Sequence, residues 1–238
     1  YSTSDAGRVS RSSAIGLMAK IYLFEKEYAK CEELCRQLYT EGKRGLLPHY
    51  SDVFNSKYNN SKESLFAAQA LIEKTELPSQ TTCYGDYTEE SDSPYKNSAA
   101  IAPLLPFASY YVPDEDKWYD TENDNRWKFN FRLASESKYK ELIAGTGTTA
   151  QHLGAGIKYK GEIVRTPYIV KFCDVENRRA DREGTSLNFP LLRWADVLLI
   201  FAEALNEQNK TNEAFTYINE VRERAYTNED GTINPGWK

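Results

Sequence analysis

The sequence predicts a mostly α-helical fold, in which helical hairpins are combined with long irregular loops and a few short strands. Two pairs of amphipathic segments, at residues 8–40 and 189–225, carry apolar side chains at the three- and four-residue steps of a helix. The stretch between the pairs is instead rich in Ser, Thr, Asn, Asp, Gly, Pro and Tyr. Such a composition is typical of loops with short strands.

The first pair begins with a helix predicted over residues 8–28, where three serines near its start offer N-cap oxygens. A second helix is predicted over residues 28–40, after a tight turn at residues 25–27. Gly42 and Gly45 then end the pair, as glycines do after a helix. The apolar residues of the two helices are Ala14, Leu17, Met18, Ile21, Tyr22, Phe24, Cys31, Leu34, Cys35, Leu38 and Tyr39.

The second pair is predicted to consist of helices at residues 189–206 and 212–225. When the two pairs are superposed, Ala19 and Cys31 align with Ala202 and Ala214, so the small residues are twelve positions apart in both. Small side chains let the helices of a hairpin approach closely. This is the packing of tetratricopeptide (TPR) repeats, and we therefore expect two TPR-like hairpins.

The middle of the chain has strand candidates at residues 65–68 and 168–172, and residues 73–100 are predicted to form a long loop. In a compact domain, a loop of that length is functional or disordered. We therefore divide the chain into a first hairpin with its strand (1–72), a loop-rich, ligand-facing insertion (73–186) and a second hairpin (187–238). Together these parts are expected to form one structural domain of a longer protein.

Charge and composition exclude several classes of function. The net charge is −5, and no basic stripe is present that could recognise nucleic acid or anionic lipid. The four cysteines are too few for a dense disulfide framework, and the two histidines, His49 and His152, form no metal-binding motif. We expect neither a metal nor a cofactor. The 17 tyrosines are notable, because tyrosine combines a flat apolar face with a polar tip.

The ends of the sequence suggest a fragment. The chain lacks an initiator Met, and residues 233–238 resemble the middle of a loop. No signal peptide, lipid-attachment cysteine or long apolar run stands at the start. The absence of a targeting signal therefore says little about the natural location.

Several short elements resemble the SusD/RagB family of nutrient-binding proteins, and they follow the family's order across nearly the whole chain. The strongest is the run from Phe189 to Glu207, FPLLRWADVLLIFAEALNE, which is close to the family signature and is continued by residues 219–225. The weaker elements are the helix pair at 11–38, LPHYSDVF at 47–54, NSKESLF at 60–66, DNR at 124–126 and YIVKF at 168–172.

This resemblance implies a SusD-like α–α superhelix and a non-enzymatic function. Proteins of this family are lipid-anchored on the outer face of the bacterial outer membrane, bind glycans (or peptides, in some members) and deliver them to a SusC-like TonB-dependent transporter. The resemblance thus implies a glycan ligand, a SusC-like partner and a membrane link only through an anchor that this fragment lacks. It does not identify the glycan.

The candidate carbohydrate-binding residues come from their placement in the 73–100 loop and from their chemistry. Sugars rest their C–H faces on aromatic rings, while their hydroxyls bond to carboxylates and amides. No family motif carries over to this loop. The candidates are Tyr84, Asp86, Tyr87, Tyr95 and Asn97, with Tyr110, Tyr111, Trp118, Tyr119 and Trp127 as weaker ones.

Two other functions, a TPR-type adaptor and a glycoside hydrolase, agree with single features of the sequence. A TPR-type adaptor would bind protein partners through a short regular array, but more than a hundred irregular residues interrupt the repeats here. A glycoside hydrolase would need a pair of carboxylates, and Asp196 and Glu203 lie two helical turns apart on one face. We expect these acids to be structural instead, paired with Arg193 or Arg222. No residue is predicted to be catalytic.

Overall fold

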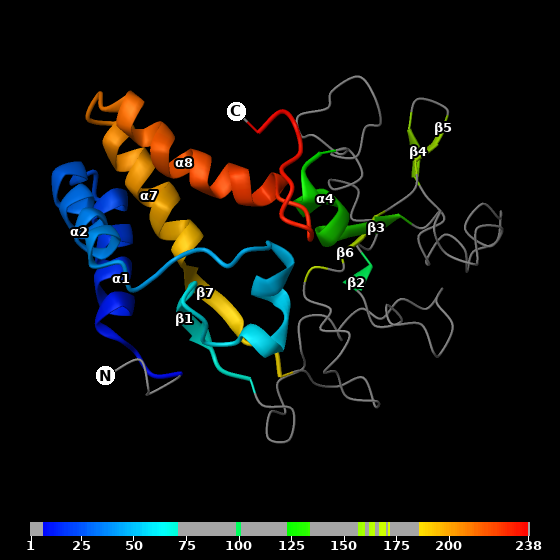
Figure 1. The fold of residues 1–238 in the computed structure, drawn as a ribbon, viewed down its shortest axis with the longest axis horizontal. Helices are drawn as coiled ribbons and strands as arrows, with labels where there is room; N and C mark the ends of the chain where they lie inside the picture. The colour runs from blue at the N-terminus through cyan, green and yellow to red at the C-terminus, as the bar shows by residue number, and fades with distance from the viewer. Residues whose placement is uncertain are drawn as a thin grey trace. The chain divides into compact units, whose positions relative to one another are not determined.

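The structure, a computed structural model, describes residues 7–70, 99–100, 123–133, 157–159, 162–164, 167–169, 171 and 186–237. The chain divides into two compact units (Figure 1). The helical unit contains Tyr1–Ala70 and Asn188–Lys238, and the inserted unit contains Leu71–Leu187. The insertion thus separates the two hairpins of the helical unit in sequence.

The helical unit consists of two helical hairpins packed against each other (Figure 1). Helices α1 (Arg11–Phe24) and α2 (Tyr28–Glu41) form the first hairpin, and α7 (Trp194–Asn206) and α8 (Thr211–Tyr226) form the second. Helix α7 packs on both α1 and α2. The remaining elements of this unit are the 3-10 turns η1 (Ser51–Phe54) and η2 (Ser56–Tyr58) and the strands β1 (Ser64–Ala68) and β7 (Phe189–Arg193).

The TPR-like packing predicted from the small residues is confirmed. Ala19 and Cys31 are fully buried in the first hairpin, and Ala202 and Ala214 are 2% exposed in the second. The turns of the two hairpins also match. Lys26 and Asn209 both have positive φ, of 60° and 62°, and in each case the next N–H bonds to the carbonyl five residues earlier. This arrangement ends both helices with the same left-handed turn.

The buried face of α1 differs from the predicted apolar face. Met18, Ile21 and Phe24 are 46%, 54% and 75% exposed, whereas Gly16 and Ala19 face the core. Helix α1 approaches the β1–β7 ladder and α7 closely at Gly16, where the nearest side chains are those of Leu192, Leu65 and Val197. The residues of α1 that are buried are Ser12, Ser13, Ile15, Gly16 and Ala19.

Gly16 gives a direct test of this close approach. A Cβ added there would lie 2.8 Å from Leu192 Cδ2 and 3.0 Å from Leu65 Cδ2, both on buried side chains. Alanine normally stabilises a helix by about 1 kcal/mol relative to glycine. Overpacking costs about 1–3 kcal/mol. We expect the net effect of Gly16→Ala to be a decrease of up to about 2 kcal/mol in the free energy of unfolding, measured by urea denaturation.

Gly45→Ala is the control for this prediction, because its new Cβ would meet only the Lys62 side chain, at 3.7 Å. It should change stability by less than about 0.5 kcal/mol. A stabilising effect of Gly16→Ala would show that α1 can move away from the β1–β7 ladder at little cost.

One predicted helix start is wrong. Residues 189–193 were predicted to begin the third helix, but they form β7, which pairs antiparallel with β1. The burial follows the two-residue period of a strand, with Leu191 47% exposed and Leu192 fully buried. The helix begins only at Trp194, where the Arg193 N–H donates to Asp196 Oδ2 at 2.8 Å.

Aromatic rings fill the space between the two hairpins. Phe201 of α7 stacks on Tyr217 of α8 with ring centroids 4.1 Å apart. Tyr39 of α2 contacts Tyr217 edge-on at 5.1 Å and stacks on Trp194 at 6.2 Å. The Tyr39 hydroxyl donates to Glu220 at 2.6 Å, and this hydrogen bond raises the pKa of Tyr39 to about 12. These contacts make the two hairpins one core.

The described part of the inserted unit contains short elements. Strands β2 (Ala99–Ala100), β6 (Pro167–Ile169) and β3 (Phe131–Leu133) form an antiparallel sheet in that order, and β4 (Ile157–Tyr159) pairs with β5 (Glu162–Val164). Helix α4 spans Asn125–Asn130. The predicted strand at 168–172 is therefore shorter, with Lys171 in a turn, and the predicted loop at 73–100 ends in a strand. The strand predicted at 65–68 is confirmed as β1.

Candidate functional site

The predicted binding residues Tyr84, Asp86, Tyr87, Tyr95 and Asn97 all lie outside the described residues. The weaker candidates Tyr110, Tyr111, Trp118 and Tyr119 do so as well, and Trp127 belongs to α4. Their assignment to a ligand site stays a prediction. The described residues show how the segment that carries them is attached to the helical unit.

The insertion leaves and re-enters the helical unit at one point, the end of the β1–β7 ladder. Ala68 pairs with Phe189, and beyond this pair the Ala70 N–H donates to Asn188 Oδ1 at 2.9 Å. Strand β1 leads into the insertion and β7 leads out of it. The ladder therefore fixes both ends of the insertion side by side.

Four amide side chains hold this point together, and we call them the amide cluster: Asn59, Asn60, Gln69 and Asn188. The Asn188 Nδ2 group donates to Gln69 Oε1 at 2.9 Å and to Asn60 Oδ1 at 3.3 Å. Gln69 and Asn60 bond to each other in both directions, at 2.9 and 3.1 Å. The Asn188 N–H donates to Asn59 Oδ1 at 3.0 Å. Since an amide both donates and accepts, the cluster needs no charge.

A buried ion pair lies immediately before β1. Glu63 is 1% exposed and Arg224, of α8, is 7% exposed. Arg224 NH1 donates to both Glu63 carboxylate oxygens, at 2.9 and 2.7 Å. The second of these oxygens also accepts the Leu47 N–H at 2.7 Å, and the Glu63 carbonyl accepts the Trp194 N–H at 2.8 Å. Glu63 thus connects the chain before β1, the start of α7 and helix α8 in one hydrogen-bonded unit.

Within the inserted unit, the predicted turn at 124–126 is held by Asp124. Its carboxylate accepts the Arg126 N–H at 2.9 Å and faces the Arg126 guanidinium, with contacts of 2.6, 3.0 and 3.1 Å. Asp124 is 6% exposed. Charge-assisted bonds of this kind are strong and directional. This acid therefore has a structural role at the start of α4.

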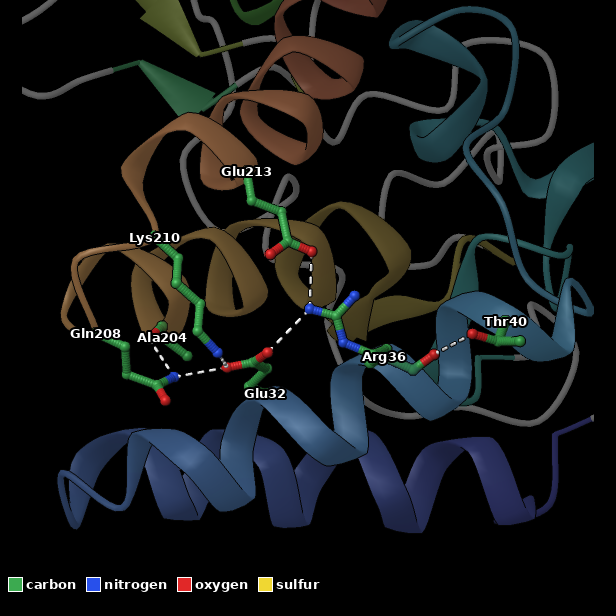
Figure 2. Close-up of polar contacts among 7 residues, drawn as sticks. All are labelled: Glu32, Arg36, Thr40, Ala204, Gln208, Lys210 and Glu213. Carbon is green, nitrogen blue, oxygen red and sulfur yellow. Dashed lines mark hydrogen bonds and ion pairs between the residues drawn. The ribbon is translucent and has the colours of Figure 1, made fainter.

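A polar cluster joins α2 to the α7–α8 turn on the surface of the helical unit (Figure 2). Glu32 accepts Lys210 Nζ at 2.6 Å, Gln208 Nε2 at 2.9 Å and Arg36 NH2 at 2.9 Å. Arg36 also donates to Glu213 at 2.7 Å. Partial burial alone would raise the pKa of Glu32, but the hydrogen bonds from Lys210, Arg36 and Gln208 outweigh it and lower that pKa. These charged groups satisfy one another and link the two hairpins.

Of the two carboxylates that suggested a hydrolase, Asp196 has structural surroundings. Asp196 accepts the N–H of Arg193 at the start of α7 and lies 3.4 Å from its guanidinium, as expected for a structural pair. Glu203 is exposed on the same helix. Among the described residues, no three His, Cys, Asp or Glu side chains come together as metal ligands would. In the same part of the chain, no helix is long and apolar enough to cross a membrane.

The comparisons with known sequences agree with the motifs. A family model described as SusD family matches residues 62–235. SusD-like protein P25 of Formosa agariphila is 27% identical over 95% of this chain, and a SusD-like protein of Bacteroides ovatus is 25% identical over 97%. These matches cover 44% and 42% of the relatives, so the chain spans less than half of their length.

Solved structures show the same fold. The surface glycan-binding protein A of Bacteroides thetaiotaomicron, solved in complex with laminarihexaose, has a TM-score of 0.63 at 17% identity, covering 95% of this chain and 49% of that one. A SusD superfamily protein of Bacteroides vulgatus has a TM-score of 0.63 at 19% identity, covering 94% and 45%. At these identities the likeness concerns the fold.

Proposed function

Because the chain belongs to the SusD family, we propose that it is part of a non-catalytic protein that binds oligosaccharides at a bacterial cell surface. In this proposal the whole protein is an outward-facing outer-membrane lipoprotein, and it passes its glycan to a SusC-like TonB-dependent transporter. The observation that carries the proposal is the family match over residues 62–235, which includes the insertion and both strands that hold it.

The geometry of the helical unit supports a carrier rather than a catalyst. Of the two acids weighed as a hydrolase pair, Asp196 accepts the Arg193 N–H and pairs with its guanidinium, and Glu203 is exposed on the same helix. The ends of the insertion are held by the β1–β7 ladder and the amide cluster. Binding residues on loops held by a rigid scaffold are common among binding proteins.

The direct test is binding without turnover. A glycan array followed by calorimetry should find an oligosaccharide that binds, and prolonged incubation with it should release no new reducing ends. Sustained release of reducing ends would contradict the proposal and favour a hydrolase. Pull-down of a SusC-like transporter by the full-length protein tests the partner separately.

Tyr84→Ala and Tyr87→Ala test where the glycan lies. Each is expected to weaken glycan affinity by about 1–3 kcal/mol, because stacking of a flat ligand face on an aromatic ring contributes that much in comparable cases. Calorimetry with the glycan found by the array gives the measurement. Tyr28→Ala, on α2 of the helical unit, is the control and should leave affinity unchanged. Unchanged affinity in both loop variants would exclude this placement of the site, while the family assignment would stand.

A further inference from the structure

A positively charged pocket lies in the helical unit, between the chain leading into α1, the segment after α2 and strand β1. Its volume is about 230 Å³, and its described lining includes the cationic residues Arg8, Lys43, Arg44 and Lys62 and no acidic residue. This is unexpected in a chain of net charge −5. Like charges gathered in one hollow repel each other unless an anion lies between them.

Arg44 is the fixed cation of this pocket. Its NH1 group donates to the Ser64 carbonyl at 2.9 Å and its NH2 group donates to Ser10 Oγ at 3.0 Å. Its Nε–H is buried and has no hydrogen-bond acceptor among the described residues. Burial lowers the pKa of the Arg44 guanidinium, yet arginine stays protonated at neutral pH. The guanidinium is therefore held in place, partly desolvated, without a carboxylate in the described part of the chain to balance it.

The start of α1 adds to the positive potential. Ser10, which lines the pocket, is the N-cap residue of this 14-residue helix, and the first turn of α1 carries no acidic residue. The N-terminal end of a helix carries a partial positive charge that favours anions. Lys43 and Lys62 are exposed, and among the described residues neither forms an ion pair. Both ammonium groups are therefore available to a ligand.

The size of the pocket limits the ligand. Clefts for drug-sized molecules have about 300–1,000 Å³, so about 230 Å³ is too small for an oligosaccharide. It suits one charged group with a few waters of about 30 Å³ each. Arginine forks and lysine ammonium groups together favour planar or tetrahedral oxygen anions.

We propose that this pocket binds an oxyanion, either as a free ion such as sulfate or as the charged substituent of an acidic saccharide. Arg44 supplies the fixed guanidinium, and Lys43 and Lys62 close on the anion from the solvent side. The site uses residues of the helical unit and does not depend on the glycan-binding proposal.

The test uses sulfate and two matched double variants. Sulfate stabilises most folded proteins because it is excluded from their surface, so the informative result is a difference between variants. Relative to sodium chloride at the same ionic strength, sodium sulfate should raise the Tm of the wild-type chain more than that of the Lys43→Gln, Lys62→Gln variant, and calorimetry should give a saturable sulfate affinity. Lys43→Gln with Lys62→Gln should weaken this affinity about tenfold, the effect of losing two charge-assisted contacts. The double variant Lys20→Gln with Lys57→Gln removes the same charge outside the pocket. It should change the sulfate affinity less than about twofold.

Two further titrations distinguish a free anion from the charged substituent of a sugar. A uronic acid monosaccharide and a sulfated monosaccharide are titrated beside neutral glucose, with the wild-type chain and both double variants. Binding of inorganic sulfate alone identifies a free-ion site, and binding of the charged sugars with the same loss in the pocket variant identifies a saccharide substituent. Equal effects of sulfate and chloride, or equal losses in the two double variants, would overturn the proposal. Because all these surface lysines can be replaced without touching the core, folding does not obscure the result.

Discussion

Glu63→Ala is expected to lower the free energy of unfolding by about 3–5 kcal/mol, the cost of breaking a buried ion pair by removing one partner. The reason is the burial of both charges: the Glu63 side chain is 1% exposed and that of Arg224 is 6% exposed. The variant leaves the guanidinium buried with no carboxylate, and it leaves the Leu47 N–H without its acceptor. Urea denaturation followed by circular dichroism measures the loss.

The matched control is a similar pair on the surface. Glu213→Ala removes an ion pair with Arg36 whose side chains are 39% and 45% exposed, and it should cost less than about 1 kcal/mol. Glu63→Leu combined with Arg224→Met should be less harmful than Glu63→Ala, because no buried charge then remains alone. A loss below about 1 kcal/mol for Glu63→Ala would show that water or another group replaces the carboxylate.

Trp194→Ala should also cost about 3–5 kcal/mol, the usual effect of deleting a large buried aromatic side chain. Trp194 is 3% exposed, is the first residue of α7 and stacks on Tyr39 of α2. Its loss therefore opens a cavity where the two hairpins meet. Thermal and urea denaturation give the change in stability.

Phe24→Ala is the control for the tryptophan variant, since Phe24 is 75% exposed at the end of α1. Its effect should stay within about 0.5 kcal/mol. If both aromatic variants have the same small effect, the contact between Trp194 and Tyr39 does not hold the hairpins together.

The sequence predicts the helices well, because their signals are local. Helical periodicity, the turn at residues 25–27 and Gly42 all act within a few residues. Helix α2 ends one residue later than predicted, and α8 extends one residue further than predicted at each end. The twelve-residue spacing of small residues also identifies the contact face of each hairpin. The error at residues 189–193 came from an apolar run that suits both a helix and a buried strand. The capping Asp196, at the third position of α7, is the signal that distinguishes them.

The contacts that hold the insertion could not be predicted in the same way. Glu63 and Arg224 both lie in family-like elements, but 161 residues separate them, and nothing local pairs a glutamate with one arginine among several. The amide cluster joins Asn60 to Asn188 across 128 residues. The pocket around Arg44 could not be predicted, because its cationic residues come from separate segments and form no continuous basic stretch in the sequence. The candidate glycan-binding residues of the 73–100 loop are chosen by their residue type and their place in the loop alone, so that site stays a prediction.

The adjacent ends of β1 and β7 have an evolutionary consequence. Closing a longer loop between two fixed points costs only about 0.6 kcal/mol for each doubling of its length. Mutation, duplication or recombination can therefore rewrite the segment between Ala70 and Asn188 while the hairpins keep their sequence. Under the proposed function, such changes would alter the glycan-binding surface while the stable helical unit is retained.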